Sequence, residues 1–111
     1  MMARVFYENV DGPAGNQVLR FEPRTKEPMH IACLWSHWTD TKGDLPELYS
    51  FAAITDEPVP EVAAAGHDRT IIDLKPEYVD AWLDPDPKNL GELHAMFDDR
   101  QRPFYEHRVA A

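Results

Sequence analysis

Short apolar runs bounded by glycine, proline and polar turn residues recur along most of the chain and predict β-strands. Aromatic and β-branched residues are frequent in these runs, which is typical of strands partly buried in a sheet. The segments expected to form strands are residues 4–8, 18–22, 29–35, 50–55, 70–74 and 102–109. The polar segments 9–16 and 36–48 between them are expected to form loops.

The segment 29–35 alternates in a way that assigns its side chains to two faces of a sheet. The residues expected on one face are Met29, Ile31, Cys33 and Trp35, with His30, Ala32 and Leu34 on the other. We therefore expect Trp35 in the core. Trp38 adjoins the polar loop and is expected to be exposed, where it could stack on an unpaired base.

Two segments near the end of the chain show the apolar spacing of amphipathic helices. Pro76 suits a first helical turn, and the segment 76–83 is expected to bury Trp82 and Leu83 against the sheet. A second helix is expected around residues 90–97. Strands gathered before a pair of helices, without regular strand–helix alternation, predict an α+β fold with a mainly antiparallel sheet.

The 111 residues suffice for one domain, so residues 1–111 are expected to form a single unit. No apolar run approaches the length of about 18 residues that marks a membrane-spanning helix, and the first residues lack signal-peptide character. We therefore expect a cytoplasmic protein without membrane association. The single cysteine cannot form an internal disulfide, which agrees with a reducing compartment.

The formal net charge of -9 disfavours strong nucleic-acid binding, because phosphate neutralisation by Lys and Arg supplies most of that affinity. A local basic strip can still exist on an acidic protein. The residues that could form it are Arg20, Arg24, Lys26 and Arg69. Any binding of single-stranded DNA is therefore expected to be weak.

His67 is the first candidate for chemistry. It follows Gly66 at the entry to a strand, where an imidazole can project into a site and titrate near neutral pH. Glu8 is the second, because two aromatic residues precede it and apolar surroundings raise a carboxyl pKa toward the range useful for acid–base catalysis. The alternatives remain a turn histidine bonded to Asp68 or backbone, and an ordinary exposed glutamate.

Other site classes are not indicated. The five histidines lack the spacing of a metal site, so we expect no metal and no cofactor. Neither Ser36 nor Ser50 lies in the glycine-framed context of a serine hydrolase nucleophile. For Arg69, two interpretations stay open: contact with a phosphate, or an ion pair with Asp68 or Asp73 that stabilises the corner.

Several motifs together resemble the SRAP family, the SOS response-associated peptidases that process abasic sites in single-stranded DNA. The family's motifs are of the types GFYEW, FAGLWE, TILTT, HDRMP, VIL and PEDWDAWLD, in this order. The matching segments here are Phe6 to Glu8, Ile31 to Trp35, Phe51 to Thr55, His67 to Arg69, Thr70 to Leu74 and Pro76 to Asp84. The resemblance covers nearly the whole chain but only the second part of the family's domain.

The resemblance implies a partial SRAP-type β-barrel and a role for specific residues. Glu8 would exchange a proton with the sugar oxygen as an abasic ring opens, and His67 would exchange protons during crosslink formation or reversal. Arg69 would contact a phosphate. Arg20 and Arg24 are expected to contact DNA only on the ground of their charge, as members of the basic strip. We expect Glu8 and His67 to approach one another across a shared concavity in the folded chain.

The family's nucleophile is a cysteine at the mature N-terminus, whereas this chain begins Met1-Met2-Ala3-Arg4. A thioether offers no thiolate, so we expect no self-made crosslink to an abasic site. Three hypotheses follow. The first is a truncated or phage-type family member that keeps the acid–base half of the site, and the second is a non-enzymatic acidic domain that binds a partner protein. The third is one half of a split protein, with an exposed apolar surface that the other half would cover.

Overall fold

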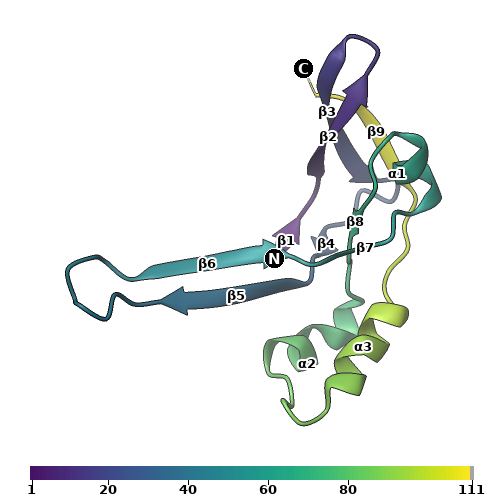
Figure 1. Cartoon of the computed structure of the whole chain (residues 1–111). Helices are drawn as coiled ribbons and strands as arrows, with labels where there is room; N and C mark the ends of the chain where they lie inside the picture. Colours follow the sequence, from purple (N-terminus) through teal and green to yellow (C-terminus); the bar gives the residue numbers. More distant parts are fainter. Residues whose placement is uncertain (111) are drawn as a thin grey trace.

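A computed structural model describes residues 1–110 and shows mostly strands, with short helices in the second half of the chain (Figure 1). The strands are β1 Met2–Ala3, β2 Phe6–Gly12, β3 Gly15–Pro23, β4 Met29–His30, β5 Cys33–Trp38, β6 Leu48–Ala53, β7 Thr55–Asp56, β8 Thr70–Ile71 and β9 Tyr105–Val109. The helices are α1 Pro60–Ala64, the 3₁₀ turn η1 Pro76–Tyr78, α2 Val79–Leu83 and α3 Leu90–Asp98. All strand pairs are antiparallel, so the α+β prediction with a mainly antiparallel sheet is confirmed.

The sheet of order β2-β3-β9 carries most of the core on one face. Phe6 stacks on Phe21 with ring centroids 5.0 Å apart, and Tyr105 meets Phe6 edge-on at 5.2 Å. The predicted loop 9–16 is wrong, because β2 continues to Gly12 and pairs with β3 down to a tight turn. Polar residues can pair there since both faces at the hairpin end are solvated, and Gly15 supplies the positive φ of 106°.

The single strand predicted over residues 29–35 is broken at Ile31 and Ala32. Before the break β4 pairs with β1, and after it β5 pairs with β6. Ala32 forms backbone hydrogen bonds with two other segments of the chain. Its N–H donates to the Ile72 carbonyl, and its carbonyl accepts from the Ile54 N–H, each at 2.9 Å. Ala32 is fully buried, and its neighbour Ile31 is buried too. The predicted alternation of residues 29–35 between two faces is therefore wrong at the break.

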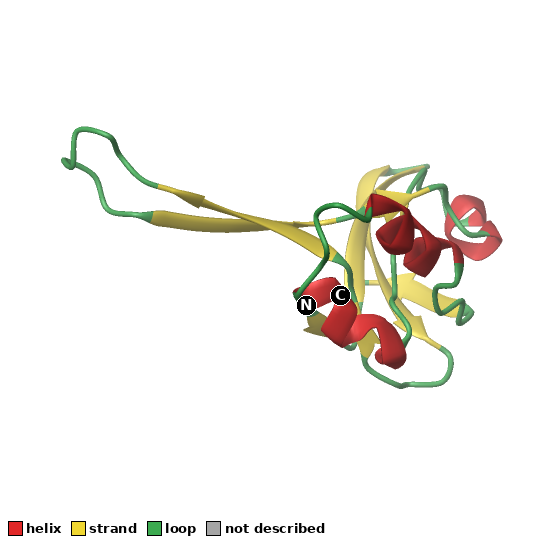
Figure 2. Ribbon diagram, turned by 90° about the horizontal axis from the view of Figure 1, so that it is seen from below, coloured by secondary structure: helices red, strands yellow, loops and turns green. Residues whose placement is uncertain are grey.

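Strands β5 and β6 form a hairpin that projects away from the rest of the chain, called the arm here and defined as residues 33–53 (Figures 1 and 2). The predicted loop 36–48 is therefore shorter, and the predicted strand 50–55 divides into β6 and β7. Trp38 is exposed as predicted. The prediction for Trp35 is wrong, because the arm has no neighbouring layer and leaves this side chain 72% exposed.

The arm explains why the chain is more extended than its length suggests. The Cα radius of gyration is 16.6 Å, whereas about 13 Å is usual for a compact domain of this size. Most of the fully buried side chains belong to the other elements and form two small clusters, around Phe21 and around Ile72. The arm contributes exposed apolar surface in place of core.

The predicted helix 76–83 divides into the 3₁₀ turn η1 and the short helix α2. Trp82 is half-buried against Phe97, with ring centroids 5.2 Å apart, and Glu77 points outward as expected. The predicted burial of Leu83 is wrong, since it lies at the last turn of α2 and is 73% exposed. Helix α3 confirms the second helix; the Asn89 side chain accepts from the Glu92 N–H at its start. Within residues 1–110, no helix has the length and apolar character needed to cross a membrane.

Candidate functional site

Strand β2 places Glu8 on the core side of its sheet. Side chains alternate along a strand, so Glu8 shares a face with the buried residues Phe6 and Val10 and lies opposite Leu19 of β3. Its side chain is 23% exposed. Burial raises the pKa of the Glu8 carboxyl, the charge of His67 lowers it in part, and that of Asp68 raises it. The apolar surroundings expected from the sequence are present.

His67 reaches the same place through a turn after α1, a helix that the sequence patterns alone did not predict. Val59, Pro60 and Glu61 begin this helix, and Val62 anchors it in the core. The backbone reverses at Gly66, whose φ of 100° is unfavourable for side-chain-bearing residues. The His67 N–H then donates to the Val62 carbonyl at 3.2 Å, so the imidazole is directed toward β2.

The two candidate side chains meet. His67 Nε2 lies 3.1 Å from Glu8 Oε2, and the His67 side chain is 18% exposed. The expected approach of residues 59 positions apart in sequence is confirmed. The concavity expected between them stays a prediction. On the far side of the ring, Nδ1 lies 2.8 Å from the Arg69 carbonyl oxygen. The Arg69 N–H also points at Nδ1, at 3.3 Å. A carbonyl can only accept, so the shorter contact favours a proton on Nδ1, with Nε2 facing Glu8.

This geometry suits bifunctional proton transfer. One proton can reside on Glu8, facing a neutral imidazole, or on Nε2, facing a carboxylate. Either arrangement keeps the 3.1 Å contact and presents one acid and one base side by side. A substrate that must lose a proton from one oxygen and gain one at another could use both groups.

Arg69 is held by Thr55. Its Nε donates to Thr55 Oγ1 at 3.0 Å, and Nη2 donates to the Thr55 carbonyl at 2.6 Å. The suggested ion pair with Asp68 or Asp73 does not form, because the guanidinium turns toward β7. Instead, Asp73 accepts from the His30 N–H at 2.8 Å. Thr55 gave no signal in the sequence that it would position an arginine.

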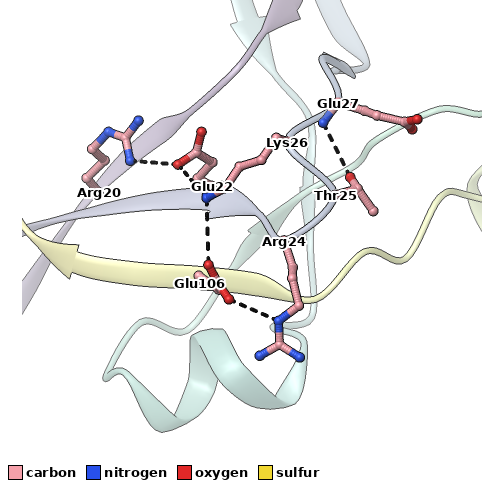
Figure 3. Close-up of polar contacts among 7 residues, drawn as sticks. All are labelled: Arg20, Glu22, Arg24, Thr25, Lys26, Glu27 and Glu106. Carbon is pink, nitrogen blue, oxygen red and sulfur yellow. Dashed lines mark hydrogen bonds and ion pairs between the residues drawn. The ribbon is translucent and has the colours of Figure 1, made fainter.

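The other predicted basic residues form a separate network on the opposite face of the β2-β3-β9 sheet (Figure 3). Arg20 lies opposite Tyr7 in the ladder, on the face that Glu8 does not share. The contacts are Arg20–Glu22, Arg24–Glu106 and Lys26–Glu22, each 3.0 Å, and Lys26–Glu106 at 3.7 Å. Arg24 also lies over the Phe104 ring at 4.2 Å. The structure therefore does not gather Arg20 and Arg24 with Arg69.

Trp38 lies on the arm, away from the Glu8–His67 pair (Figure 1). The arm contains a second histidine–glutamate contact, in which His37 Nε2 lies 3.1 Å from Glu47 Oε2. It differs in burial, since the Glu47 side chain is 63% exposed.

Within residues 1–110, no three His, Cys, Asp or Glu side chains group as a metal site requires. The absence of a metal and of a cofactor stays a prediction.

Gly66→Ala should destabilise the chain by about 1–2 kcal/mol, because alanine disfavours a positive φ. Urea unfolding measures this cost. The NMR signals of the His67 ring should also shift, since the turn aims the imidazole at Glu8. Gly43→Ala is the matched control, with a φ of 73° at the arm tip; it should leave those signals in place. Unchanged His67 signals in Gly66→Ala would show that the turn does not position the ring.

Glu8→Gln should stabilise the chain near neutral pH. The raised pKa means that the folded chain holds the Glu8 proton more tightly than the unfolded chain does. The resulting stabilisation is complete below the ordinary value of 4.5 and is lost as pH rises through the raised pKa. Glutamine stays neutral, so the variant's advantage should shrink on acidification. Thermal melts of the parent and the variant, from acidic to neutral pH, test this prediction. A difference in melting temperature that does not change with pH would contradict it.

Comparisons with known proteins agree with this architecture. The model of the family described as SOS response associated peptidase (SRAP) matches residues 1–110. A crystal structure of a protein from Bordetella bronchiseptica is similar with a TM-score of 0.71 at 16% identity, covering 100% of this chain and 53% of that chain. A crystal structure of a protein from Bacteroides thetaiotaomicron is similar with a TM-score of 0.74 at 17% identity, covering 100% of this chain and 48% of that chain. At these identities the likeness shows the fold alone, and this chain spans about half the length of both proteins. No curated protein matches the sequence.

Proposed function

The chain belongs to the SOS response associated peptidase (SRAP) family, and from this premise we propose that Glu8 and His67 provide acid–base catalysis at abasic sites in single-stranded DNA. The observation that carries the proposal is the 3.1 Å contact between His67 Nε2 and Glu8 Oε2 on the core side of β2. Both residues stand in motifs that resemble those of the family, in the family's order. The proposal places the protein in the cytoplasm, in a response to DNA damage.

The proposed step is opening of the abasic sugar ring. In the closed hemiacetal, the anomeric carbon carries a hydroxyl group and a bond to the ring oxygen. The carboxylate of Glu8 removes the hydroxyl proton, the carbonyl forms, and the bond to the ring oxygen breaks. His67 Nε2 donates its proton to the leaving ring oxygen, so protons and electrons balance. The open aldehyde is then available to an amine.

The test uses an aminooxy probe, which captures only the open aldehyde. A single-stranded oligonucleotide with one abasic site is incubated with the probe, with and without the chain. Probe capture should be faster with the chain present whenever ring opening limits the rate. An oligonucleotide with a reduced abasic site is the control for probe specificity. An unchanged capture rate would overturn the proposed function.

DNA binding should be weak and depend on Arg69. Arg20, Arg24 and Lys26 are already paired with Glu22 and Glu106, so a phosphate would have to displace a carboxylate. Contact with one phosphate gives a slope of log affinity against log salt of about −0.7, whereas three would give about −2. Titration of fluorescent single-stranded DNA at several salt concentrations measures it.

Arg69→Ala should abolish the remaining binding, and Arg24→Ala is the matched control that should leave it intact. A steep slope, or equal losses in both variants, would contradict the assignment of Arg69 as the phosphate contact.

A second candidate function is a domain that binds a partner protein without catalysis. The observation that favours it is the arm, where large apolar side chains lie exposed on a chain of formal net charge -9. This candidate requires no proton transfer by Glu8 and His67. A chain that leaves probe capture unchanged in the test above would support it.

A further inference from the structure

The arm exposes apolar side chains on both of its faces. In its ladder Trp35 lies opposite Phe51 and His37 opposite Tyr49, so these four share one face. On the other face Leu34 lies opposite Ala52, and Trp38 opposite Leu48. The exposed fractions are 64% for Leu34, 72% for Trp35, 47% for Trp38, 58% for Leu48, 65% for Tyr49 and 67% for Phe51.

Three rings of the first face lie close together. The His37 and Tyr49 rings stack with centroids 4.2 Å apart and an interplanar angle of 2°, and Trp35 lies 6.4 Å from Tyr49. A hairpin on a solvated surface normally has one polar face. Two strands alone are also marginally stable in water. Both features indicate a hairpin whose two faces are covered when the protein is in its working state.

We propose that the arm is the docking surface for the remaining part of the SRAP fold, a polypeptide that packs against both faces of β5 and β6. The two solved structures superpose on this chain along its whole length, yet each is about twice as long. Each therefore contains a similar amount of additional polypeptide. Additional polypeptide of that size is enough to form a layer on each face of the arm.

A second copy of this chain fits the arm less well. Face-to-face packing of two arms would cover one face of each and leave the other exposed. Two copies would also bring together two chains of formal net charge -9. Edge-to-edge pairing would extend the ladder without covering either face.

Single-stranded DNA also fits the arm poorly, although aromatic side chains stack on bases. The charged residues of the arm are Asp40, Asp44 and Glu47 against Lys42. The local charge of about −2 repels phosphates, and DNA binding depends on their neutralisation. The arm's apolar and acidic character favours a polypeptide occupant.

The test places a photo-crosslinking residue on the arm. Phe51→p-benzoylphenylalanine is expressed in the cells from which the protein comes, irradiated, and the crosslinked peptides are identified by mass spectrometry. Leu83→p-benzoylphenylalanine is the control, because Leu83 is 73% exposed but lies on α2. The expected product joins position 51 to a polypeptide that matches the portion of the two solved structures not covered by this chain, whether in the same chain or a separate one.

A product containing a second copy of residues 1–111, DNA or an unrelated polypeptide would overturn the proposal, as would yields no greater than at position 83. Adding Trp35→Ser to the photo-reactive protein should reduce the yield at least fivefold, since Trp35 lies directly opposite position 51. The urea midpoint of this variant shows whether the body of the fold is intact. The readout is contact rather than catalysis, so its outcome is independent of the acid–base proposal.

Discussion

Glu8→Gln and His67→Ala are each expected to lower the catalysed rate of abasic ring opening by about 10²–10⁴-fold, the usual contribution of a positioned acid or base. Glutamine keeps the size of Glu8 but can neither accept nor release the proton. Alanine removes Nε2, which lies 3.1 Å from the carboxylate. The capture rate of an aminooxy probe on single-stranded abasic DNA measures both losses.

The arm provides a matched control for this experiment. His37 and Glu47 make a contact of the same 3.1 Å length on an exposed hairpin. Glu47→Gln and His37→Ala should leave the rate within about twofold of the parent, because this contact lies on the arm and not at the Glu8–His67 pair. Equal losses in both pairs would show that the assay reports something other than the Glu8–His67 site.

Phe21→Ala should cost about 3–5 kcal/mol of the free energy of unfolding. Phe21 is fully buried and stacks on Phe6 at 5.0 Å, in a core made small by the projecting arm. Marginal stability is typical of small domains, so this loss should leave a large unfolded fraction at room temperature. Urea unfolding monitored by circular dichroism measures it.

Phe51→Ala is the control for Phe21→Ala. Both phenylalanines lie in strands, but Phe51 is 67% exposed on the arm. Its replacement should change the free energy of unfolding of the 111-residue chain by no more than about 0.5 kcal/mol. Similar costs for the two variants would contradict the exposed position of the arm.

The sequence predicts the elements best where the covering layer belongs to this chain. Apolar residues of β2 and β3 pack in the cluster around Phe21, and those of α3 pack in the cluster around Ile72. Their periodicity therefore correctly indicated strands and a helix. Strands β5 and β6 have the same apolar character, yet Trp35 is exposed because no layer formed by residues 1–110 covers the arm. A hydrophobic pattern shows that a surface tends to be buried; it does not show what buries it.

The candidate site was predictable in part. The order of the FYE and HDR motifs indicated that Glu8 and His67 meet, and the structure places them 3.1 Å apart. The turn that brings them together depends on Gly66 and on α1, which pattern alone did not predict. Arg20 and Arg24 were expected near the DNA. A list of charges cannot reveal that Glu22 pairs with Arg20 within β3, or that Glu106 of β9 pairs with Arg24.

A double-mutant cycle on ring opening tests the central claim most directly. If Glu8 and His67 act as one acid–base unit, Glu8→Gln/His67→Ala should lose no more rate than either single variant, because the first change already removes the proton exchange. Probe-capture rates of the four proteins on the same single-stranded abasic oligonucleotide give the coupling. Rate losses that multiply in the double variant, or four equal rates, would contradict the claim that this pair opens the abasic sugar.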